Sequence, residues 1–141
     1  MGMVSLVYVS FATNPMEDDE LRELLKKSRE NNKALDVTGM LLYRDGFFIQ
    51  ALEGEDKTVT DLYAKIKKDP RHRGALQVYK EPISKRSFSD WSMGFNKIAT
   101  GSLEQLEGFT DFMIKPDPEF FTKTPSHART LLHMFRNRVY F

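Results

Sequence analysis

The first apolar segment of the chain, residues 4–10, is rich in β-branched and aromatic side chains, which is typical of a β-strand. Because side chains alternate between the two faces of a strand, Tyr8 shares a face with the apolar residues two positions away. Shorter segments at 76–79 and 91–95 predict two further strands. Pro82 is expected to end the first of them.

A β-hairpin is predicted from the middle of the chain. Two apolar segments, 39–43 and 47–52, flank an Asp-Gly pair, which is a strong hairpin signal. On the second strand, Gln50 faces the same way as its apolar neighbours Phe48 and Leu52. A polar amide therefore occupies a position where an apolar side chain is expected.

Two amphipathic helices are predicted from apolar residues at helical spacing. The first follows Asn14-Pro15, where Asn can cap the helix and Pro suits its first position. Its apolar stripe brings Asn32 to the inward side, with Asn31 beside it, and a buried amide needs hydrogen-bond partners. The stripes are Leu21, Leu24, Leu25 and Ser28 in the first helix, and Val59, Leu62, Tyr63 and Ile66 in the second.

The order of these elements predicts an α+β fold, a ferredoxin-like βαββαβ sandwich with an extra fifth strand and two helices on one sheet face. With two crossover helices, the first and third strands are expected to lie side by side and parallel. Tyr8 and Gln50 both face the predicted helices. The two side chains would therefore approach each other between the helices.

The pattern changes after Ala99, where prolines punctuate a loop-rich segment between 116 and 125 and Ser126 can cap a last helix. We therefore divide the chain into a domain at 1–98 and a C-terminal loop and helical extension at 99–141. The extension is expected to pack on the open face of the sheet rather than to bind a partner. The residues expected to do so are Leu131, Leu132 and Phe135.

Composition argues against several classes of protein. The 141 residues carry 21 basic and 20 acidic side chains, so the chain lacks the basic excess of a dedicated nucleic-acid binder. Cysteine is absent, which excludes disulfides and thiolate metal sites and is compatible with the cytoplasm. The three histidines, His72, His127 and His133, form no convincing metal set. No apolar segment approaches the roughly 18 residues of a membrane span.

Motifs of the common enzyme classes are also missing. The chain has no GxGxxG, Walker A, GxSxG or HExxH pattern. Glu53 and Glu55, on either side of Gly54 in a strand-to-helix turn, are expected to be solvated or to cap the helix.

A polar trio, Tyr8, Asn32 and Gln50, occupies inward-facing positions. One interpretation is a core tyrosine and two amides whose hydrogen bonds are satisfied within the fold. The other is a site for a planar, amide-rich ligand such as a flavin, since Asn and Gln supply both donors and acceptors. Spacing alone leaves both interpretations open. The apolar residues that could enclose such a ring are Leu24, Phe48 and Ile66.

Several short segments, in their order and spacing, resemble one known family. They are Leu6-Val7-Tyr8-Val9-Ser10, Asn31-Asn32, Thr38-Gly39-Met40-Leu41, Phe48-Ile49-Gln50-Ala51-Leu52-Glu53-Gly54, Asp69-Pro70-Arg71-His72 and Phe88-Ser89-Asp90-Trp91-Ser92-Met93. Any one of them is a weak signal. Together they make residues 4–98 resemble the BLUF family, the sensors of blue light using FAD.

The resemblance implies a role for each matched residue. Tyr8 and Gln50 match the photoactive pair beside the flavin. Asn32 matches the residue that binds the pyrimidine edge of the ring, and Asn31 occupies a neighbouring contact position. The positions near the ring or the ribityl-phosphate end of the cofactor are matched by Lys65, Asp69, Arg71 and His72.

The resemblance also implies a function, that of a blue-light photoreceptor and not of an enzyme. The expected cofactor is FAD, held non-covalently, with FMN or riboflavin as alternatives. After excitation, Tyr8 would transfer an electron and a proton toward the flavin, Gln50 would rearrange, and the charge would return to Tyr8. Trp91 and Met93 match a segment implicated in relaying the signal, and either could pack near Gln50.

The segment after Ile98 is too short for an output enzyme. The chain is therefore expected to signal through an unidentified partner protein or through self-association, with a homodimer as the expected oligomer. Two other classes stay open, because one fold serves many functions. One is a light-independent small-molecule-binding or acylphosphatase-like domain. An acylphosphatase-like enzyme should have an Arg and Asn phosphate site in the loop after the first strand, and the loop at 11–14 has no Arg. A flavin-dependent reductase should have a nicotinamide-binding motif, and none is visible.

Overall fold

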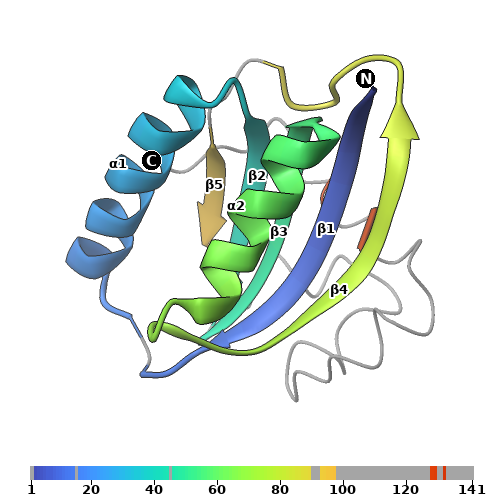
Figure 1. Ribbon diagram of the computed structural model, residues 1–141. Coiled ribbons are helices and arrows are strands. Elements are labelled where there is room, and N and C mark those ends of the chain that lie inside the picture. The colour runs from blue at the N-terminus through green and yellow to red at the C-terminus, as the bar shows by residue number, and fades with distance from the viewer. Residues whose placement is uncertain are drawn as a thin grey trace, which may run out of the picture.

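The computed structural model describes residues 2–14, 16–44, 46–89, 93–97, 128–129 and 132. These residues form a five-stranded sheet in the order β4-β1-β3-β2-β5, with helices α1 and α2 on one of its faces (Figure 1). The α+β, ferredoxin-like prediction is confirmed, including the fifth strand. The elements are β1 (Met3–Ala12), α1 (Asp18–Ala34), β2 (Thr38–Arg44), β3 (Phe47–Glu55), α2 (Asp56–Lys68), β4 (His72–Ile83) and β5 (Gly94–Lys97).

The central strands β1 and β3 are neighbours, but they are antiparallel, so the prediction of a parallel pair is wrong. The reason lies in the hairpin. The β1–α1–β2 crossover makes β2 run in the same direction as β1, and the tight turn at Gly46 then reverses the chain into β3. In the resulting register Tyr8 lies directly opposite Gln50.

The sheet separates two layers of apolar side chains. The helix-facing core includes Leu6 and Tyr8 of β1 and the apolar stripes of both helices. The outer core, on the opposite face, includes Val7, Val9 and Ile49 together with Ala128 and Leu132 of the C-terminal segment. Burial on both faces explains why β1 and β3 are almost continuously apolar.

The described part of the C-terminal segment agrees with the prediction for Leu132, which is buried in the outer core beside Ala128. Between them, Arg129 reaches β4, where its guanidinium pairs with the carboxylate of Glu81 at 2.6 Å. It also lies over the ring of Tyr79. The predictions for Leu131 and Phe135 lie outside the described residues.

Several predicted boundaries are wrong. The fifth strand, predicted at 91–95, is Gly94–Lys97, because the chain still bends at Met93, and β4 begins at His72 and not at 76. The helix α1 begins at Asp18, because Met16 donates its backbone N–H to Tyr43 on β2 and Glu17 is still extended. An acidic first turn then complements the helix dipole, in place of a cap at Asn14. The strand β4 continues through Pro82, which an edge strand tolerates since its outer side needs no ladder hydrogen bond. Among the described residues, no helix is long and apolar enough to cross a membrane.

Candidate functional site

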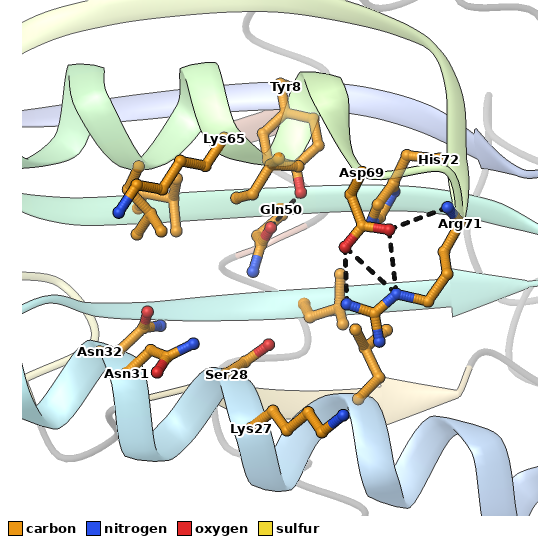
Figure 2. A pocket seen from close by; sticks show the side chains of 15 residues that line it. Tyr8, Lys27, Ser28, Asn31, Asn32, Gln50, Lys65, Asp69, Arg71 and His72 are labelled. Atoms are coloured by element: carbon orange, nitrogen blue, oxygen red, sulfur yellow. Dashed lines mark hydrogen bonds and ion pairs between the residues drawn. The ribbon is translucent and has the colours of Figure 1, made fainter.

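A hollow lies between α1 and α2, above the middle of the sheet (Figure 2). Water-sized groups can occupy about 200 Å³ of it, and the hollow opens to solvent. The helices form its walls, and β1, β2 and β3 form its floor. Its lining consists of Tyr8, Leu24, Lys27, Ser28, Asn31, Asn32, Leu41, Gln50, Leu52, Leu62, Lys65, Ile66, Asp69, Arg71 and His72.

The floor of the hollow carries a hydrogen-bonded pair. Tyr8 on β1 and Gln50 on β3 are cross-strand partners, and both side chains point to the helix side. The Tyr8 hydroxyl donates to Oε1 of Gln50 (Figure 2). Tyr8 is 1% exposed and Gln50 is 5% exposed, so the bond is made away from bulk water.

The other end of the Gln50 amide is also bound. Its Nε2 donates to Sδ of Met93, at an N···S distance of 3.3 Å. Met93 directly precedes β5 and is fully buried. Of the two residues predicted near Gln50, Met93 is therefore in contact with it, whereas Trp91 lies outside the described residues.

Tyr8 is held in its neutral form. Burial raises the pKa of its phenol well above the ordinary value, and the nearby Tyr63 and Asp69 raise it further. The ring of Tyr63 lies 5.1 Å from that of Tyr8, tilted by 42°. A neutral phenol remains a hydrogen-bond donor at any physiological pH, which agrees with its bond to Gln50.

Two amides and a hydroxyl project from the end of α1 into the hollow (Figure 2). Asn32 is buried, whereas Asn31 is exposed at the rim. Ser28 lies one turn before Asn32. Leu24 on α1 and Ile66 on α2 give apolar walls on the two sides. The site thus combines apolar walls with amide donors and acceptors at its edge.

A charged pair lies at the opening of the hollow. The guanidinium of Arg71 binds both carboxylate oxygens of Asp69, with the shortest N···O distance 2.6 Å. This hydrogen bonding with Arg71 lowers the pKa of Asp69 to about 2. Next to it, Nδ1 of His72 lies 3.0 Å from the hydroxyl of Ser10, and burial lowers the pKa of His72.

The structure thus brings together ten of the eleven residues predicted to bind a cofactor. The exception is Phe48, which does not line the hollow. It is fully buried beneath it, where its ring packs against those of Tyr43 and His72. Helical spacing could have added Lys27 and Ser28, since they lie four residues before Asn31 and Asn32. The other lining residues that the sequence analysis did not single out for the site are Leu41, Leu52 and Leu62.

Glu53 also departs from the prediction. It is neither solvated nor a helix cap but only 1% exposed, on the outer face of β3. Its carboxylate accepts the backbone N–H groups of Ser87 at 2.7 Å and Phe88 at 2.9 Å, and the hydroxyl of Thr38 at 3.1 Å. These bonds offset the cost of burying a carboxylate and fix the segment between β4 and β5. Glu55, by contrast, is exposed.

Within the described part of the chain, no group of three or more His, Asp or Glu side chains lies close enough together to hold a metal ion.

Comparison with known families gives a match over residues 3–94. The family model that matches is BLUF, described as sensors of blue-light using FAD. The photoactivated adenylate cyclase subunit beta of Euglena longa is 37% identical over 92 residues, which is 64% of this chain and 11% of that protein. Subunit alpha of Euglena gracilis is 36% identical over 86 residues, or 61% of this chain and 8% of that protein. The chain thus spans only about a tenth of these relatives.

Solved structures resemble the chain over more of its length. The photo-activated state of BlsA has a TM-score of 0.75 at 28% identity, covering 92% of this chain and 94% of that one. The dark state of BlrB, a BLUF protein, has a TM-score of 0.71 at 30% identity, covering 94% and 97%. A bacterial light-regulated adenylyl cyclase has a TM-score of 0.66 at 32% identity, covering 94% of this chain and 36% of its own.

Proposed function

Because this chain belongs to the BLUF family of flavin-binding blue-light sensors, we propose that it is a photoreceptor that holds its flavin non-covalently in the hollow between α1 and α2. The observation that carries the proposal is the buried hydrogen bond from Tyr8 to Gln50 on the floor of that hollow. The matched family is one of sensors, so the domain is a sensory module and is not itself catalytic.

The residues of the hollow fit such a ring. Leu24 and Ile66 line the hollow from the two helices and would cover the two sides of the ring, with Gln50 and Tyr8 below. The amide of Asn32 can donate and accept at the pyrimidine edge, because an amide offers both functions from one side chain. Asn31 would make the neighbouring contact at the rim.

The bound flavin supplies the absorption of blue light and an excited state that accepts an electron. The protein supplies Tyr8, which gives up an electron and a proton and then regains them. Gln50 responds by rearranging, through rotation, tautomerisation or both. An amide has a donor end and an acceptor end, so two hydrogen-bonding arrangements fit nearly the same volume. In the present arrangement Oε1 faces Tyr8 and Nε2 faces Met93.

We propose FAD as the natural cofactor, over FMN or riboflavin. The matched family is described by that cofactor. The opening of the hollow supports a phosphorylated tail, because Lys27, Lys65 and Lys68 gather there around the Asp69–Arg71 pair. Cations at this place would attract phosphate groups that extend from the ring toward solvent.

For the output, we propose that the rearrangement of Gln50 is passed to Met93 and the neighbouring Trp91, and from there to an effector protein or a second copy of the chain. Relatives that contain this domain are named as photoactivated adenylate cyclase subunits. These names support an output through an effector protein. The division into a sensory domain at 1–98 and a signalling segment at 99–141 remains part of this proposal.

The test is optical. The purified protein should be yellow, and blue light should produce a small red shift of its flavin absorption that reverses in darkness. Denaturation should release the flavin, and chromatography of the released cofactor should identify it as FAD. A colourless protein that takes up none of the three flavins would overturn the proposal and favour a light-independent binding domain.

A further inference from the structure

One residue of α1 reaches across to the segment that precedes β5. Nε of Arg29 donates to the backbone carbonyl of Met93, at an N···O distance of 2.8 Å. Arg29 lies one turn before Asn32 and is half-buried at the edge of the helix-facing core. Neither its spacing nor the family resemblance assigns it a role.

Met93 therefore has hydrogen-bond contacts on two sides. Its thioether accepts Nε2 of Gln50, and its carbonyl accepts Nε of Arg29. Gln50 in turn accepts a hydrogen bond from the hydroxyl of Tyr8. The four residues are therefore joined by one continuous series of hydrogen bonds. This series of hydrogen bonds begins on the floor of the hollow and ends on helix α1.

The two bonds to Met93 differ in strength. A thioether is a weak acceptor, and the long methionine side chain adapts to many packings. A guanidinium bond to a carbonyl is assisted by charge and is roughly twice as strong as a neutral one. The strand that follows, β5, is only four residues long and lies at the sheet edge. The contact with Arg29 is thus the stronger of these two hydrogen bonds to Met93.

The position of Arg29 also has a cost. Burial withdraws part of its guanidinium from water and lowers its pKa. Its hydrogen bond to Met93 offsets part of this cost.

We propose that Arg29 is a positioning residue for the light reaction, which holds the backbone of Met93 so that its thioether stays against the amide of Gln50. When Gln50 turns its Oε1 toward Met93, the thioether loses its donor. Arg29 therefore favours the arrangement in which Nε2 faces Met93. Its removal should change the relative stability of the two arrangements and with it the rate of thermal return.

The hydrogen bond can be observed directly by isotope labelling. Only Met1-Gly2 and Met93-Gly94 combine methionine with a following glycine. Labelling with [1-¹³C]methionine and [¹⁵N]glycine therefore isolates the Met93 carbonyl in a carbonyl-correlated NMR spectrum, with Met1 as internal reference. In Arg29→Gln the Met93 carbonyl signal should move upfield, as expected when a carbonyl loses a strong donor. The Met1 signal should stay in place. The measurement works with and without flavin.

The photocycle gives the second readout. In Arg29→Gln the dark-recovery rate should change by a factor of three or more, whereas the flavin content should match that of the wild type. A slower recovery would identify the present arrangement of Gln50 as the dark state, and a faster one as the lit state. Arg29→Lys keeps a cationic donor and should restore part of the wild-type rate.

The matched control is Arg22→Gln, which removes the same charge from the same helix at an exposed ion pair with Asp19. It should leave both readouts unchanged. An unmoved Met93 signal together with a recovery rate within 1.5-fold of the wild type in Arg29→Gln would overturn the proposal. If Arg29→Gln does not fold, as judged by its thermal midpoint, two other measurements decide whether Arg29 positions Met93. They are the recovery rate of Arg29→Lys and the chemical shift of the Met93 carbonyl in the wild type.

This inference rests on the proposed function, but the two can fail separately. A wild-type protein without a reversible red shift contradicts the photoreceptor. A wild-type protein that photocycles normally, with Arg29 variants identical to it, contradicts only the role of Arg29.

Discussion

Tyr8 and Gln50 stand directly opposite each other on β1 and β3, and the phenol donates to the amide oxygen inside the fold. This bond is set by the register of two central strands. Neither residue can leave its partner without a side-chain rotation or a slip of the sheet, and a one-residue slip would turn one side chain to the other face. The register of the sheet therefore fixes the position of the pair.

Tyr8→Phe and Gln50→Leu should each retain flavin and lose the normal light-induced red shift. The first removes the only hydroxyl on Tyr8, and the second removes both ends of the amide while keeping a similar volume. Light-minus-dark absorption spectra would check this. Tyr63→Phe is the control, since its ring packs against Tyr8 but lies outside the Tyr8–Gln50–Met93 chain of bonds. A normal photocycle in either test variant would refute the assigned roles.

Asn32→Ala should weaken flavin binding by roughly three- to tenfold, as expected for the loss of a hydrogen-bonding amide worth about 0.5–1.5 kcal/mol. Fluorescence titration of flavin-free protein with flavin measures the dissociation constant. Asn31→Ala is the matched comparison, because Asn31 lies at the exposed rim and should matter less. Equal affinities for wild type and Asn32→Ala would place the pyrimidine edge elsewhere.

Glu53→Ala should destabilise the fold by about 2–4 kcal/mol, because it leaves the N–H groups of Ser87 and Phe88 without their acceptor. Urea denaturation followed by circular dichroism measures the change. Glu55→Ala, two residues further along the chain and exposed, should change the unfolding free energy by less than about 0.5 kcal/mol. Similar losses in the two variants would mean that the buried network is not a stabilising clamp.

The lowered pKa of Asp69 predicts that the free energy of unfolding depends on pH. Hydrogen bonding with Arg71 lowers its pKa from 3.8 to about 2 in the folded state. Since the folded value is the lower one, the stabilisation is fully present above pH 4 and is lost as the pH falls toward 2. Urea midpoints of the wild type should therefore fall between pH 4 and pH 2 more steeply than those of Asp69→Asn. Parallel curves for the two proteins would show that the pair contributes nothing.

The sequence predicted the parts of the site that depend on local periodicity. Alternation along β1 and β3 placed Tyr8 and Gln50 on the helix side, and helical spacing placed Asn32 inward. These predictions require only that the inward-facing side of each strand or helix is known. The direction of β3 was wrong because it depends on which strands the crossover joins, and that is a property of the whole topology.

The contacts of Glu53 and Met93 could not be predicted from the periodicity of the sequence. Alternation puts Glu53 on the face opposite Gln50, but it does not reveal that the segment after β4 folds over this face and donates its backbone N–H groups. Likewise, the contact between Met93 and Gln50 joins residues 43 positions apart across two elements. Such contacts follow from the packing of irregular segments, which has no repeat in the sequence.

The strand β3 serves both layers of the core, with Gln50 in one and Glu53 in the other. The residues between them alternate, so the two polar side chains emerge on opposite sides of a single extended backbone. A sub-ångström movement of this backbone would displace Gln50 in one layer and Glu53 in the other, without any side chain crossing the sheet. One inserted residue between the two would bring both onto the same side and remove one of them from its layer.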